Sequence, residues 1–255
     1  MPNPFDPNAD RYRAQQENAK RRQERPYARE MLRIFRKASR EAAEAAAQGL
    51  DWRLGPYITR GMGEDVARVM RGRNESVARW WGNETRKHAR KQFGARVERK
   101  GYAEDFELWL QRWLVTYTAG KIVQVTDTTR DQIRRAVDHG LREGLGAAQL
   151  ARYIRRTSDI ISQSRALTIA RTETSGAANA ATINAADALD IEVVREWVAV
   201  EDGRTRPTHA AADGQQVGRG ESFQVGGASL SQPGDPSGPA GEIINCRCGV
   251  ALRNV

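Results

Sequence analysis

The chain has 255 residues, of which 39% are hydrophobic and 29% are charged, with a formal net charge of +9. This composition suits a soluble protein with one sizeable core or two small ones, and it argues against outright disorder. No apolar run approaches the ~20 residues that a membrane helix needs, and the first residues lack the apolar segment of a secretory signal. We therefore expect the protein to be made, and to act, in a cytoplasmic environment.

The positive charge is unevenly distributed along the chain. Residues 1–126 hold 26 Lys and Arg against 16 Asp and Glu, whereas residues 127–255 hold 15 against 16. Such asymmetry indicates a polyanion or an acidic protein surface as the partner of the first half. Arg-rich solvated helices without any such partner would give the same pattern.

Residues 1–26 are expected to form a flexible N-terminal arm, because four prolines stand among polar and charged residues with almost no apolar content. From Tyr27 onward, apolar residues recur at helical spacing, which predicts a basic helical region over residues 27–125. Aromatic residues between Phe106 and Tyr117 recur at intervals of three, four and seven. We expect this row to pack against neighbouring helices rather than to bind a cofactor.

Within this region, residues 84–100 carry seven basic residues and two acidic ones. A helix that is basic nearly all round could contact DNA phosphates or an acidic partner. A solvated linker helix is the simpler alternative, and His88 is expected to be a bystander. The candidate contact residues are Arg86, Lys87, Arg90, Lys91, Arg96, Arg99 and Lys100.

Residues 126–190 are predicted to be helical. One helix should begin at Thr126 or Asp127, a short one should follow around Leu150, and a long one should run from about Ser164 to Leu189. The inward positions of the long helix are mostly small residues, which let helix axes approach closely, so we expect it to lie deep in a bundle. Charges in the middle of this helix, at Arg171 and Glu173, either anchor the next domain or simply face solvent.

After Asp190 the sequence becomes rich in Gly and Pro and holds short β-type runs at Val193–Val200, Ser222–Val225 and Gly249–Leu252. The predicted fold is therefore a mainly α N-terminal helical region followed by a small α+β, loop-rich C-terminal domain over residues 191–255. A core of this size usually needs a staple, a metal or a partner.

The reactive side chains of this domain include the only two cysteines of the chain. His209, Cys246 and Cys248 would offer a soft N, S, S ligand set for structural zinc, the one cofactor that the residues suggest, and Asp202 or Asp213 could complete a tetrahedron. The spacing matches no standard zinc finger. A disulfide is the least favoured interpretation, since residues i and i+2 of a strand lie ~6.5 Å apart.

Three interpretations of these residues remain open. A metal-dependent hydrolase or nuclease would keep a water on the metal and use Glu242 or an Asp as general base. A Cys–His nucleophile is a weaker variant. A purely structural role is more economical, because Asp202 can cap a turn while arginines cross-link loops and the cysteines pack as small apolar groups.

The blocks "ARTE", "DGRTRPTH", "DGQ", "PGDP" and "EIINCRC", in this order and spacing, resemble the phage Mu F-like minor head proteins, also called phage head morphogenesis proteins. The resemblance covers roughly residues 125–250. The residues that match the family signature are Arg171, Thr172, Glu173, Trp197, Asp202, Arg204, Arg206, His209, Asp213, Gly214, Pro233, Gly234, Asp235, Glu242, Asn245, Cys246, Arg247 and Cys248.

The resemblance implies a low-copy virion component in the head interior or at the portal vertex, made in the cytoplasm of a bacterial host. Portal or capsid proteins would be its partners, with packaged double-stranded DNA as a further candidate. It would act in head assembly, DNA packaging or DNA delivery, and no enzymatic activity is expected of it. We also expect no toxin role, since the sequence shows none of the toxin domains that some relatives carry after this module. The alternatives are the metal-dependent hydrolase and a non-specific DNA-binding protein acting through the basic half.

Overall fold

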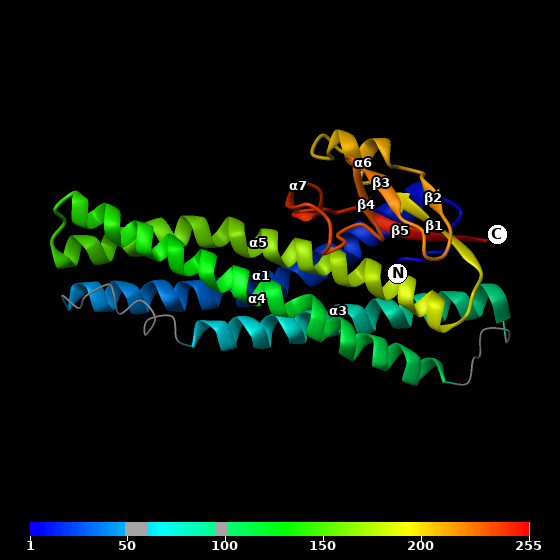
Figure 1. The fold of residues 1–255 in the computed structure, drawn as a ribbon, viewed down its shortest axis with the longest axis horizontal. Helices are drawn as coiled ribbons and strands as arrows, with labels where there is room; N and C mark the ends of the chain where they lie inside the picture. The colour runs from blue at the N-terminus through cyan, green and yellow to red at the C-terminus, as the bar shows by residue number, and fades with distance from the viewer. Residues whose placement is uncertain (49–60, 95–100, 255) are drawn as a thin grey trace. The chain divides into compact units, whose positions relative to one another are not determined.

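The computed structural model of the chain describes residues 1–48, 61–94 and 101–254 (Figure 1). Within these residues, four long helices precede a set of short strands and helices, so the expected fold class is confirmed. The helices are α1 (Ala9–Ala47), α3 (Met62–Phe93), α4 (Tyr102–Arg142), α5 (Ala147–Ala188), α6 (Pro207–Ala211) and α7 (Ala240–Ile243). The strands are β1 (Val193–Val198), β2 (Gln216–Val217), β3 (Phe223–Val225), β4 (Ala228–Leu230) and β5 (Gly249–Asn254).

The chain divides into two compact units. Unit 1 consists of Met1–Glu24, Arg73–Leu114 and Thr168–Val255, and unit 2 consists of Arg25–Gly72 and Val115–Leu167. Among the described residues, no helix combines the length and the apolar character that crossing a bilayer requires.

Unit 2 is helical, and its buried residues follow the expected apolar stripes. Met31 and Phe35 of α1 are buried, as are Val66 and Met70 of α3. The half-buried Arg165 of α5 lies over the Phe35 ring at 5.0 Å and donates to the carbonyl oxygen of Val125 at 2.8 Å. Burial lowers the pKa of Arg165 to about 10.

Unit 1 has a helical core in which α3, α4 and α5 pack together. Trp81 of α3 and Phe106 and Leu110 of α4 belong to one buried cluster with the alanines of α5. A Cβ at Gly82 would lie 2.3 Å from the Phe106 ring, so the absence of a side chain there lets the aromatic ring seat against α3. The aromatic row thus packs between helices, as expected.

The strands of unit 1 form a three-stranded antiparallel sheet in the order β2-β1-β5 and a separate hairpin of β3 and β4. The strands and the two short helices gather in one part of the unit, drawn from yellow to red in Figure 1. A second buried cluster, with Trp197, Phe223 and Leu230, lies among them. β5 runs two residues beyond the expected strand, and β1 ends two residues earlier than expected.

The small residues of α5 allow the close approach that the sequence predicts. Residues 172–183 of α5 are all buried. A Cβ at Gly234 would lie 3.2 Å from the Cα of Gly176 on α5, and Gly234 also has a φ of +78°. Both conditions favour glycine at position 234, which explains one element of the "PGDP" block.

The expected flexible arm over residues 1–26 is wrong, because α1 begins at Ala9 and continues through Pro26. Phe5 and Tyr12 are buried, and so are Gln16, Lys20 and Glu24. The backbone N–H of Leu252 donates to the carbonyl of Pro4 at 2.8 Å, and the Tyr12 hydroxyl donates to the carbonyl of Val250 at 2.7 Å. The sequence looked flexible because most of the docking residues of α1 are polar, and their hydrogen bonds replace apolar burial.

Two expected helix boundaries are also wrong. α4 runs without interruption through Thr126 and Asp127, and α5 joins the expected short helix around Leu150 to the long one. Thr126, one of the two expected helix starts, instead donates its hydroxyl to the carbonyl of Ile122, four residues earlier within α4.

Candidate functional site

Three candidate metal ligands come together in unit 1. The Nδ1 of His209 lies 3.3 Å from the Sγ of Cys248 and 3.7 Å from the Sγ of Cys246, and all three residues are at most 2% exposed. Their ligand atoms lie within 4.8 Å of one another. Both cysteines are free.

Short elements position these side chains. His209 lies on α6, which begins at Pro207 after an extended Arg206, an arrangement that suits a proline at the first helical position. Asn245 has a φ of +64° and turns the chain between α7 and the cysteines. Cys246 and Cys248 lie one residue apart in the segment without regular secondary structure before β5, and both sulfur atoms face the Nδ1 of His209.

The other ring nitrogen of His209 has a carboxylate partner. The Nε2 of His209 lies 3.0 Å from the Oε2 of Glu242, which also accepts a hydrogen bond from the Thr208 hydroxyl at 2.9 Å. A carboxylate accepts, so this contact places the ring proton on Nε2 and leaves the Nδ1 lone pair facing the two sulfur atoms.

The pair of thiols is electrostatically asymmetric. A hydrogen bond between the two sulfur atoms lowers the pKa of Cys246 to about 7 despite its burial, and the same bond together with burial raises the pKa of Cys248. The Nζ of the buried Lys20 donates to the carbonyl of Cys248 at 2.7 Å. Burial lowers the pKa of Lys20 to about 8.

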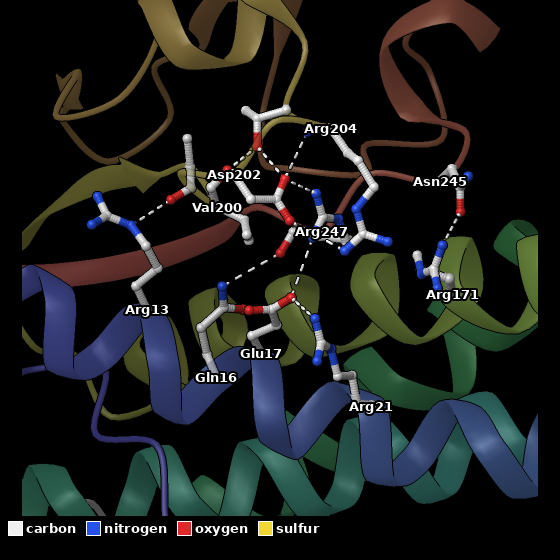
Figure 2. A network of polar contacts seen from close by, with 12 residues as sticks. Arg13, Gln16, Glu17, Arg21, Arg171, Val200, Asp202, Arg204, Asn245 and Arg247 are labelled. Carbon is white, nitrogen blue, oxygen red and sulfur yellow. Dashed lines mark hydrogen bonds and ion pairs between the residues drawn. The ribbon is translucent and has the colours of Figure 1, made fainter.

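Asp202 lies in a separate network on the surface of unit 1 (Figure 2). Its two carboxylate oxygens accept from Arg247 at 2.7 and 2.6 Å, and its Oδ1 also caps the backbone N–H of Arg204 at 3.0 Å. These hydrogen bonds, that of Arg247 first, hold the pKa of Asp202 well below its usual range. Arg247 also reaches Glu17 of α1 at 3.2 Å.

Asp213 has a similar structural role. Its carboxylate accepts from the backbone N–H of Ala199 at 2.6 Å and from Arg13 of α1 at 3.1 Å. Because both carboxylates bind arginines, the expectation that Asp202 or Asp213 completes a metal tetrahedron is wrong. Gly214, with a φ of +74°, donates its N–H to the carbonyl of Trp197 at 2.9 Å.

The charges in the middle of α5 do anchor neighbouring segments. Arg171 donates to the Oδ1 of Asn245 at 2.8 Å and lies 3.5 Å from Glu24. Glu173 is buried and accepts from Asn74 at 3.1 Å. The simpler alternative, that these charges face solvent, is therefore wrong for Glu173 and incomplete for Arg171.

The remaining signature residues are also engaged within unit 1. Burial raises the pKa of Asp235, but hydrogen bonds from Ser231 and Ser237 outweigh this and leave it below its ordinary value. Arg206 donates to the carbonyl of Ile244 at 2.5 Å. The buried Trp197 ring packs edge-on against His209 and Phe223, with centroids 5.5 and 5.4 Å apart.

Sequence reasoning missed one residue at the centre of this arrangement. Asn179 of α5 donates to the carbonyls of Pro233 and Cys248, at 2.9 and 3.0 Å, and accepts from the N–H of Val250 at 3.1 Å. The available signal was a carboxamide in a helix segment made almost wholly of small residues.

The predicted DNA-contact residues are only partly described. Lys87, Arg90 and Lys91 are exposed on α3, and Arg86 is half-buried with its guanidinium 4.6 Å from the Tyr102 ring centroid. Thr85 and Ala89 are buried, so this segment is not basic all round. Arg96, Arg99 and Lys100 lie outside the described residues.

Comparison with known proteins finds one family model that matches part of the chain. The model of the family described as "Phage Mu protein F like protein" matches residues 131–251. The chain is also 33% identical over 131 residues to the NAD(+)--arginine ADP-ribosyltransferase EFV of Enterococcus faecalis (strain ATCC 700802 / V583). That alignment covers 50% of this chain and 26% of the relative, so the chain spans about a quarter of the relative's length. No solved structure matches the chain.

Proposed function

We propose that the chain is a minor head protein at the portal vertex, because the model of the phage Mu F-like family, which supports a role in phage head morphogenesis, matches residues 131–251. In this role it would be a low-copy virion component that contacts portal or capsid proteins. It would act in head assembly, DNA packaging or DNA delivery, after synthesis in the cytoplasm of a bacterial host.

One observation supports a structural role for the shared module rather than an enzymatic one. Its charged signature side chains are engaged in contacts within unit 1 that join its loops and short helices to one another and to α1. Asp202 binds Arg247, Asp213 binds Arg13, and Glu242 binds His209. The aligned segment is only about a quarter of the ADP-ribosyltransferase. We therefore take the shared segment to be a module that occurs in proteins of different activities.

Association with the portal is the direct test. Co-expression of the tagged chain with the portal protein of the same phage-like particle should yield a complex that co-purifies with assembled portal rings. Purified heads should then contain the chain in a few copies each, measured by quantitative mass spectrometry against the portal. Heads with normal amounts of portal but without this chain would contradict the proposal.

A basic cleft in unit 2 favours a polyanion as a second partner. The cleft has a volume of about 690 Å³ and lies between α1 and α5. The cationic residues that line it are Arg33, Arg36, Lys37, Arg40, Arg155 and Arg156. Among the described residues that line it, Asp159 is the one carboxylate, and it pairs with Arg36 at 2.7 Å. We propose duplex DNA as the ligand, since such a cluster matches the phosphate backbone.

Charge reversal distinguishes this cleft from the basic segment of α3. The triple variant Arg33→Glu, Arg40→Glu and Arg156→Glu should weaken duplex binding in fluorescence anisotropy. The slope of log K against log[salt] should fall by about 0.9 for each phosphate that the variant no longer neutralises. The matched control, Lys87→Glu with Lys91→Glu on α3, should leave the slope within error of the parent chain. Equally weakened binding by both variants would contradict a specific role for the cleft.

A further inference from the structure

We propose that His209, Cys246 and Cys248 bind one zinc ion that stabilises the C-terminal part of unit 1. Zinc binds cysteine sulfur and histidine nitrogen at about 2.3 and 2.0–2.1 Å in tetrahedral geometry. Such bonds place a nitrogen and a sulfur ligand about 3.6 Å apart. The two Nδ1–Sγ distances of 3.3 and 3.7 Å therefore already match the edges of a zinc tetrahedron.

The protonation of the imidazole also fits a metal ligand. Glu242 accepts from Nε2, so the lone pair of Nδ1 is directed at the space beside the two sulfur atoms. Metal-binding histidines commonly donate their second N–H to a carboxylate, which fixes the ring and makes it a better ligand. Thr208 in turn holds the Glu242 oxygen, so the orienting residue is itself fixed.

The candidate ligands lie in a buried, mostly apolar environment. Cys246 and Cys248 pack in the apolar cluster as small hydrophobic groups, but the imidazole of His209, which is 2% exposed beside Trp197, is a polar group that apolar packing does not require. Zn²⁺ balances the charge of two thiolates, so metal binding would remove the cost of ionising two adjacent sulfur atoms in the interior. Three protein ligands leave one tetrahedral position, which a water molecule would fill, and in this the site differs from most structural zinc sites, where the protein supplies all four ligands.

Metal analysis of the full-length chain tests the site. Protein purified without chelator should contain about one zinc per chain by inductively coupled plasma mass spectrometry. Cobalt substitution should produce thiolate-to-metal charge-transfer absorption. Removal of the zinc by a strong chelator should lower the melting temperature by roughly 5–10 °C, if free zinc stands near 100 times its dissociation constant beforehand.

Variants separate the metal site from general packing. Cys246→Ser should lose the zinc and the cobalt band. Glu242→Gln should still bind one zinc at saturation, but about 10–100-fold more weakly, which identifies Glu242 as a positioning residue. Glu221→Gln, a carboxylate that caps the Gly218 N–H in the same part of unit 1, is the matched control and should retain parental affinity.

A parent chain that folds without zinc and whose melting temperature does not respond to chelator would overturn the proposal. The same holds if cobalt titration of the refolded parent gives no charge-transfer band. Both measurements use the parent chain, so the test does not depend on whether the cysteine variant folds.

Discussion

Replacement of Asn179 by alanine is expected to lower the free energy of unfolding by about 3–5 kcal/mol. The carboxamide forms hydrogen bonds with two carbonyls and one N–H of the C-terminal segments, all of them buried. Alanine would leave the Pro233 carbonyl and the Val250 N–H without this partner, at a cost of about 1–3 kcal/mol for each group that water cannot reach, whereas the Cys248 carbonyl keeps its hydrogen bond from Lys20. Urea denaturation followed by circular dichroism measures the change.

Asn184→Ala is the matched control, because Asn184 lies on the same helix and its side chain donates to the carbonyl of Ala180, four residues earlier on that helix. We expect it to change stability by less than about 1 kcal/mol, since alanine also has the better helix propensity. If both variants lose the same stability, then helix propensity and not the cross-link explains the effect.

Replacement of Phe5 by alanine should lower the free energy of unfolding by about 3–5 kcal/mol, as is usual when a buried aromatic side chain is removed. Phe5 is 4% exposed and packs edge-on against Phe93 of α3, with centroids 5.5 Å apart. A flexible arm would tolerate this change without loss. Thermal and urea denaturation of the full chain therefore decide whether residues 1–8 belong to the core of unit 1.

Leu108→Ala on α4 serves as the control, because Leu108 is 48% exposed and its truncation should cost well under 1 kcal/mol. A Phe5→Ala variant as stable as the Leu108→Ala variant would contradict the docking of the first residues. Hydrogen exchange at Leu252, whose N–H donates to Pro4, gives an independent measure of the same contact.

The sequence predicted the fold class because its two signals are local. Helical periodicity marks Met31 to Phe35 and Phe106 to Tyr117, and the shift to glycine, proline and β-branched residues marks the start of the strands. The prediction of a flexible arm over the first 26 residues was wrong for a physical reason. Gln16, Lys20 and Glu24 form a buried face through hydrogen bonds, and a pattern of apolar residues cannot reveal such a face.

The sequence alone pointed to the three candidate metal ligands, but it did not show which residues surround them. His209, Cys246 and Cys248 are rare residue types with few alternative roles, so composition alone singles them out. Asp202 and Asp213 were wrongly associated with them, because their arginine partners Arg247 and Arg13 lie 45 and 200 residues away in the chain. A single sequence does not show which of its many arginines pairs with a given carboxylate.

The contact between Tyr12 and Val250 spans 238 residues of sequence. At about 5–20 residues per second, a ribosome needs roughly 10–50 s to make that interval. Throughout that time Gln16, Lys20 and Glu24 of α1 stay exposed to solvent, because the segments that bury them have not yet been synthesised. An apolar face of the same size would invite aggregation during synthesis, whereas these side chains are well hydrated until β5 emerges. The polar character of this interface is thus suited to a unit whose first and last segments are joined late.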